Sequence, residues 1–386
     1  MSILKHTIPF AFLPRDPKED NRATTPLELL FDLAAVVAIG MVARGLAHSF
    51  IEEQVALGLI RFLFSFFMIW WAWMNYVWFA SAYYNHSGVF QLLTMVAMFG
   101  LLIVAAGVEM LFSGERIWLV LAGFIVLRLA MIFFWLGAAQ GDPLRRRTGR
   151  RYAAGLFIMQ LFWLVVVAVV PPGSILYLPL FLLGAAGELA VPALAEWKIG
   201  TPWHRGHIIS RYARLNLIVL GQCFIAIVLA MKGSPGMIFP EWGMLGQALL
   251  FAIVGFSMWS FYFTHEEHLG SDDLRRALLW GYGHFAVFGA AAMAGAGMQV
   301  VLATDAYAAT PVVLPIAVYC ATLWLIRDRY CRIGMGRWTL LVTALVLAIV
   351  GSMPLAGFNL VAVALVLAGA VFIHQWYVPA LSGPAH

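Results

Sequence analysis

The chain has 386 residues, of which 63% are hydrophobic and only 11% are charged. Soluble domains carry about 25% charged residues, so this composition excludes a water-soluble globule and requires lipid as the solvent. The net charge of +5 does not indicate nucleic-acid binding, because membrane proteins retain Lys and Arg in their cytoplasmic loops. We therefore expect the lipid bilayer, and no nucleic acid, as a partner.

Apolar stretches follow one another along the chain, separated by short polar breaks. Most approach the roughly 20 residues that a helix needs to cross about 30 Å of hydrocarbon. The sequence predicts an all-α fold, a polytopic transmembrane helical bundle of about twelve spans. Pro354 interrupts the last apolar region, which forms either two spans or one span with a re-entrant piece. The expected spans cover residues 26–49, 54–80, 89–112, 116–138, 152–170, 175–195, 208–231, 243–264, 277–301, 309–326, 338–353 and 356–377.

Basic residues alternate from loop to loop. The N-terminal tail and the even-numbered loops hold most of them, whereas the odd-numbered loops offer only Arg116 and Lys232. The positive-inside rule then places the N-terminus and the even-numbered loops in the cytoplasm. With an even number of spans, the C-terminus is cytoplasmic too. Residues 1–25 contain no long apolar region, so we expect no cleaved signal peptide.

A shift of about 190 residues aligns parts of the two halves. Asp32 then falls on Gln222, and Glu109 falls on Gln299. Chance similarity is the alternative, but two acid-to-Gln matches at one offset favour a parallel six-plus-six repeat, as in several transporters. The expected parts are a cytoplasmic tail (1–25), a first membrane half (26–195), a cytoplasmic linker (196–207) and a second membrane half (208–386).

Charged residues inside the spans are candidates for function, because a charge in hydrocarbon is costly. Glu28 and Asp32 lie four residues apart, and therefore on one face of the first helix. A carboxylate in this place can load and release a proton. For Glu28 the alternative is stabilisation of the helix N-terminus after Thr24-Thr25-Pro26. The expected substrate or proton pathway comprises Glu28, Asp32, Arg128, Asn216, Gln222, His284 and Gln299.

The remaining charged residues in the spans are expected to form structural ion pairs that hold helices together. A functional role is the alternative for the two acids among them. The expected pairs join Glu109 with Arg44 or Arg61, and Glu188 with Arg211 or Arg214.

The aromatic residues crowd the second span, where Trp70, Trp71 and Trp73 lie deep. Tryptophans at this depth either pack between helices or form the wall of an apolar or cationic substrate site. The sequence alone leaves both interpretations open.

The histidines and cysteines form no recognised metal motif. The segment 265–268 (HEEH) lacks the zinc-protease spacing, and the three cysteines match no metal knuckle. No P-loop or catalytic triad pattern occurs either, so we expect no metal, no cofactor and no catalytic residue. The alternative is an intramembrane metal or haem enzyme that uses His48, His204, His207 and His284.

Three segments resemble motifs of the bacterial low temperature requirement protein A (LtrA) family. Residues 25–33 (TPLELLFDL) resemble its opening signature, residues 207–222 resemble a segment with E-R and L-G-E, and residues 282–285 (YGHF) resemble a Y-x-H segment. This chain has Ser210 and Gln222 where the family commonly has Glu. The resemblance implies a bacterial cytoplasmic (inner) membrane protein tied by name to growth in the cold.

These features together predict a secondary transporter or permease for an unidentified small solute. If transport is proton-coupled, Asp32 with Glu28 is the expected coupling acid, and Arg128 is a counter-ion or an anion contact. The alternatives are a membrane sensor or assembly protein for adaptation to cold, with a partner on the basic loops, and the intramembrane enzyme described above.

Overall fold

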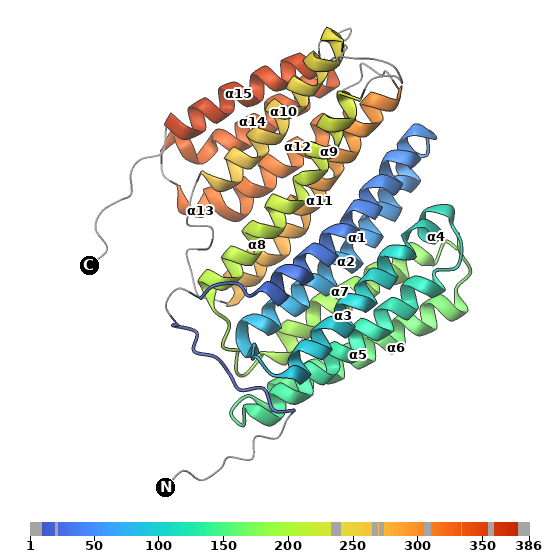
Figure 1. The fold of residues 1–386 in the computed structure, drawn as a ribbon, viewed down its shortest axis with the longest axis vertical. Coiled ribbons are helices and arrows are strands. Elements are labelled where there is room, and N and C mark those ends of the chain that lie inside the picture. Colours follow the sequence, from blue (N-terminus) through green and yellow to red (C-terminus); the bar gives the residue numbers. More distant parts are fainter. Residues whose placement is uncertain are drawn as a thin grey trace. The chain divides into compact units, whose positions relative to one another are not determined.

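The computed structural model describes residues 10–19, 22–232, 241–264, 269, 274–304, 310–332, 334–353 and 359–376. All regular elements in these ranges are helices, so the predicted all-α fold is confirmed (Figure 1). In chain order they are α1 (Pro26–Ile51), α2 (Val55–Tyr83), α3 (Gly88–Ala106), α4 (Val108–Ser113), α5 (Trp118–Gly141), α6 (Arg146–Val169), α7 (Tyr177–Ala195), α8 (Arg205–Val219), α9 (Gly221–Ala230), α10 (Trp242–Phe263), α11 (Leu274–Thr304), α12 (Thr310–Leu323), the π-helix η1 (Trp324–Asp328), α13 (Arg329–Cys331), the 3-10 helix η2 (Met335–Trp338), α14 (Thr339–Ser352) and α15 (Asn359–Trp376).

Among the described residues, 10 helical segments are long and apolar enough to cross a membrane. Some segments consist of two helices in succession, as where α3 is followed by α4 after Gly107 and α8 by α9 after Leu220. Two shorter apolar segments, Gly336–Ser352 and Asn359–Gln375, follow near the C-terminus. Together they agree with the predicted count of about twelve and confirm a polytopic helical membrane protein.

The last apolar region forms two helices, α14 and α15, that pack against each other. With 14 and 18 residues they are about 21 and 27 Å long, shorter than the roughly 30 Å of a bilayer core. Pro354 and the segment 265–268 lie outside the described residues.

The chain forms two compact units. Unit 1 comprises Met1–Gly45 and Ile60–Arg211, and unit 2 comprises Leu46–Leu59 and Tyr212–His386. In unit 1, α5 packs against α3 and α6, and α6 packs against α7 (Figure 1). In unit 2, α11 packs against α9 and α12, while α10 packs against α9 and α15. The parallel repeat stays a prediction.

Small residues bring α3 and α5 of unit 1 into backbone contact. A Cβ atom on Gly100 would lie 2.7 Å from the carbonyl oxygen of Gly123, and one on Gly123 would lie 2.6 Å from that of Gly100. Any side chain larger than hydrogen would push the two helices apart. Such close packing at small residues is a common basis of helix association in lipid.

Candidate functional site

The N-terminus of α1 is fixed by a capping box that involves Glu28. The backbone N–H and the hydroxyl of Thr25 both donate to Glu28 Oε2, each at 2.9 Å, and the backbone N–H of Glu28 lies 3.3 Å from Thr25 Oγ1. Pro26 opens the helix, where its missing N–H costs nothing. One carboxylate oxygen of Glu28 thus stabilises the helix end, and the other is left to face the bundle.

Arg211 of α8 joins Glu28 to Asp32. Its Nη1 donates to Glu28 Oε1 at 3.0 Å, while Nε and Nη2 donate to the two oxygens of Asp32 at 3.1 and 2.5 Å. The guanidinium also donates to the backbone carbonyl of Glu28 at 3.2 Å. All three side chains are buried, with at most 1% of their surface exposed. This two-pronged geometry is the strongest form of the Arg–carboxylate pair.

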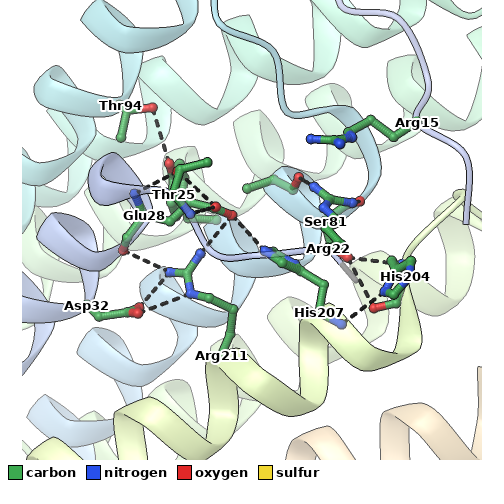
Figure 2. Close-up of polar contacts among 12 residues, drawn as sticks. Arg15, Arg22, Thr25, Glu28, Asp32, Ser81, Thr94, His204, His207 and Arg211 are labelled. Atoms are coloured by element: carbon green, nitrogen blue, oxygen red, sulfur yellow. Dashed lines mark hydrogen bonds and ion pairs between the residues drawn. The ribbon is translucent and has the colours of Figure 1, made fainter. Parts of the chain in front are cut away.

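His207 completes the cluster one helical turn before Arg211 (Figure 2). Its Nε2 lies 3.0 Å from Glu28 Oε1, and its side chain is fully buried. Two carboxylates therefore face one guanidinium and one imidazole. With a neutral imidazole the cluster carries one excess negative charge, and with a protonated imidazole it is balanced. We call Glu28, Asp32, His207 and Arg211 the acid–arginine cluster.

Aromatic side chains of α2 enclose this cluster. The indole N–H of Trp73 donates to Asp32 Oδ1 at 2.7 Å. Tyr76 stacks on Phe31 at 4.0 Å, and its ring lies 6.0 Å from the guanidinium carbon of Arg211. The aromatic wall keeps water away and supplies one further donor to a carboxylate.

A second ring of contacts ties the cluster to the N-terminal tail. The backbone N–H of His207 donates to His204 Nδ1 at 3.0 Å, and His204 Nε2 lies 2.8 Å from the carbonyl oxygen of Glu19 (Figure 2). Arg22 donates to the carbonyl oxygens of Ser81 and Ala80. Burial lowers the pKa of Arg22 to about 10, so it remains charged at neutral pH. The tail is therefore part of the site.

Glu188 of α7 forms a second buried ion pair within unit 1. Its Oε1 accepts from Arg128 Nη2 at 2.5 Å and from the Trp163 indole at 2.9 Å, and its Oε2 accepts from the Trp71 indole at 2.9 Å. The predicted pairing of Glu188 with Arg211 or Arg214 is therefore wrong. The partner comes from α5 because α6 brings α5 and α7 together, which the sequence separation of 60 residues conceals.

The predicted pairing of Glu109 with Arg44 or Arg61 is also wrong. Glu109 and Arg44 are exposed, and neither takes part in an ion pair within the described parts of the chain. Arg61 donates to the carbonyl oxygen of Phe112 instead. A free carbonyl at the end of α4 satisfies this guanidinium without an acid.

The predicted pathway residues of the second half all lie in unit 2. Asn216 Nδ2 donates to the Tyr319 hydroxyl at 3.0 Å, and that hydroxyl donates to the carbonyl oxygen of Met258. His284 Nδ1 lies 2.8 Å from the Trp280 carbonyl oxygen, so Nδ1 carries the proton and Nε2 accepts from Tyr262 at 3.0 Å. Gln222 is buried beside the break before α9, while Gln299 on α11 and Arg214 on α8 are half-buried. Their role in a pathway stays a prediction.

The most informative residues that sequence reasoning missed are the indole donors Trp71, Trp73 and Trp163. Packing between helices or an aromatic wall was expected for Trp71 and Trp73, and no role was predicted for Trp163, but each indole N–H bonds to a buried carboxylate. The available signal was the presence of tryptophans and acids inside the predicted spans: the three indoles bond to two acids, Asp32 and Glu188. Within the described ranges, no group of three or more His, Cys, Asp or Glu side chains is placed to hold a metal ion.

Fold and site together define a polytopic helical membrane protein with charge clusters buried in its bundle. The family model for the bacterial low temperature requirement A protein (LtrA) matches residues 23–373, nearly the whole length, and the chain belongs to this family. The resemblance read from the sequence is confirmed, and two of its three segments meet in the acid–arginine cluster. No curated protein and no solved structure matches the chain.

Proposed function

We propose that this protein is a proton-coupled secondary transporter or permease for a small solute, with the acid–arginine cluster as its proton-binding centre. The observation that carries the proposal is the charge count at this site. Among the described residues, the two carboxylates form direct ion pairs with one guanidinium and with the His207 imidazole, while the charged Arg22 acts on Glu28 from beyond contact distance. Within the four residues of the acid–arginine cluster, a proton on His207 or on a carboxylate balances the charges of the direct ion pairs.

The charge balance of the cluster matters because the cluster is buried within the helical bundle. An uncompensated charge in hydrocarbon is costly, so the proton-free and proton-bound forms of the cluster favour different surroundings. The proton-free form favours access of water or a cation, and the balanced form favours a closed bundle. This difference in free energy is what a coupled transporter needs to link proton binding to a conformational change.

The bidentate contact of Arg211 with Asp32 also serves stability, and the two roles are compatible. Arg211 holds α8 against α1, while the second carboxylate, Glu28, provides the charge in excess. His207 lies on the Glu28 side of the cluster, so Glu28 and His207 are the natural pair to share the proton.

The test compares small-molecule content in cells that express the intact protein, Asp32→Asn, Glu109→Gln or neither, at low and normal temperature. Asp32→Asn removes a buried carboxylate, and the control Glu109→Gln makes the same chemical change at an exposed position of the same unit. One solute should change with the intact protein and with the control, and not with Asp32→Asn. Normal solute accumulation by Asp32→Asn, with the variant and the intact protein present in equal amounts in the membrane, would refute the proposed role of the cluster.

A direct measurement addresses the proton itself. Purified protein in vesicles that contain a pH-sensitive dye should acidify the lumen when the identified solute is driven inward. His207→Gln cannot carry a proton and should transport without this signal. Proton movement that persists in both His207→Gln and Asp32→Asn would place the coupling site elsewhere.

We further propose the bacterial inner membrane as the location, with both termini in the cytoplasm. The support is the basic α5–α6 connection and the start of α6, which hold Arg145, Arg146, Arg147, Arg150 and Arg151. A reporter that is active only outside the cytoplasm should be silent when fused after residue 150 and active when fused after residue 115. The reverse pattern would invert the topology.

A further inference from the structure

An apolar groove of about 500 Å³ lies between α14 and α15 in unit 2. Exposed Val342 and Leu365 form its walls, whereas Thr343 and Ala370 are buried at its base. Gly369 also lines the groove, and a Cβ atom added there would meet no heavy atom within 4 Å. In a protein that spans a membrane, such a groove faces acyl chains rather than water.

One end of the groove carries an aromatic residue and a cation. Trp338 lines this end, and the guanidinium carbon of Arg337 lies 5.6 Å from its ring centre. Arg337 is half-buried, and its Nε has no hydrogen-bond partner in the described structure. Tryptophan is enriched at the level of lipid headgroups, so Arg337 lies at the depth where it can contact a lipid phosphate.

The surroundings of Arg337 are rich in positive charge. The segment 327–337 holds four arginines and a single acid, Asp328. Asp328 is buried and pairs with Arg327 at 2.6 Å and with Arg332 at 3.8 Å, so its ion pairs with arginine are made to these two residues and not to Arg337. Burial lowers the pKa of Arg332 to about 10, which still leaves it charged at neutral pH. This end of unit 2 therefore favours an anion.

We propose that the groove is a binding site for an anionic phospholipid, with one acyl chain between α14 and α15 and the phosphate at Arg337. Basic residues beside a gap between membrane helices are the arrangement that recognises acidic headgroups. The shortness of α14 and α15 leaves apolar surface that an ordered lipid completes. The site is independent of the acid–arginine cluster.

The test measures lipid retained by the purified full-length protein in mild detergent, by native mass spectrometry, with phosphatidylglycerol, phosphatidylcholine or oleate added. Gly369→Leu fills the groove, and Gly246→Leu is its control on α10, because a Cβ atom there also meets nothing within 4 Å. Arg337→Gln removes the cation, and Arg151→Gln removes an equal charge from an exposed position in unit 1.

The intact protein and both controls should retain phosphatidylglycerol about fivefold better than phosphatidylcholine, the factor that one basic residue near a membrane surface contributes. Arg337→Gln should lose this preference, and Gly369→Leu should lose both lipids while unfolding at the same temperature as Gly246→Leu. Equal retention of the two lipids by the intact protein would overturn the proposal. Oleate binding that matches phosphatidylglycerol and ignores Arg337→Gln would also overturn it.

Discussion

Replacing Arg211 with Gln should destabilise the protein more than neutralising either acid that it binds. Arg211→Gln leaves Glu28 and Asp32 as two buried carboxylates without their shared cation. Removal of one partner from a buried ion pair costs about 3–5 kcal/mol, because the other charge is left in a medium of low polarity. Asp32→Asn instead leaves Glu28 and Arg211 as a balanced pair and should cost about 1–2 kcal/mol.

The measurement is thermal unfolding in detergent of each single variant and of the double variant that combines Arg211→Gln with Asp32→Asn. At about 2–4 °C per kcal/mol for a unit of this size, Arg211→Gln should lower the Tm by about 6–20 °C and Asp32→Asn by about 2–8 °C. The double variant removes one charge of each sign, so its loss should be at least about 1 kcal/mol smaller than the sum of the single losses. Arg44→Gln, at an exposed position on α1, is the control and should stay within about 0.5 kcal/mol of the intact protein.

Two outcomes would refute this reasoning. Equal losses for Arg211→Gln and Asp32→Asn would mean that the guanidinium is no more important than one of its acids. Additive losses in the double variant would mean that the two side chains do not interact in the folded protein, despite the 2.5 Å contact.

Three further outcomes follow from contacts within unit 1. Trp73→Phe removes a donor to the buried carboxylate of Asp32 and should lower stability by about 1.5–3 kcal/mol in thermal unfolding; no loss would mean that water replaces the indole. Burial raises the pKa of Glu196, so the folded state keeps a proton that the unfolded state loses above about 4.5. The stability contribution is present below that pH and is lost as the pH rises through the folded pKa, and Glu196→Gln should flatten this fall in a series of unfolding curves. Gly100→Ala should cost about 1–3 kcal/mol because its methyl group would collide with the backbone of α5, whereas Gly88→Ala on the same helix has open space and should not destabilise; equal effects would argue against the close contact.

The fold could be predicted because lipid imposes simple rules on sequence. Runs of about 20 apolar residues and short polar breaks located the helices, since every backbone polar group must be satisfied within its own helix. The breaks within spans, such as those after Gly107 and Leu220, were not predicted. They depend on local packing, which composition does not record.

The site could be predicted only in part. Glu28 and Asp32 were placed on one helix face by their spacing, which is a local property. Their partner Arg211 was assigned to Glu188, because the pairing of α8 with α1 joins residues 179 apart and follows from the packing of the bundle. The indole donors were missed for the same reason. A tryptophan in an apolar span predicts a buried side chain, but the packing of the helices determines which acid its N–H contacts.

Two of the tryptophans of α2, Trp71 and Trp73, restrict how this helix can move. Trp71 and Trp73 are two residues apart, so their side chains leave the helix about 200° apart, and each is bonded to an acid on a different neighbour, Glu188 on α7 and Asp32 on α1. A rotation or a slide of α2 by even one residue would break both bonds at once. Hydrogen bonds on two sides of α2 therefore fix both its rotation and its position along its axis. Any motion of unit 1 that preserves these bonds must move α1, α2 and α7 together. Relative movement is then confined to the surfaces where these three helices contact the other helices of the unit.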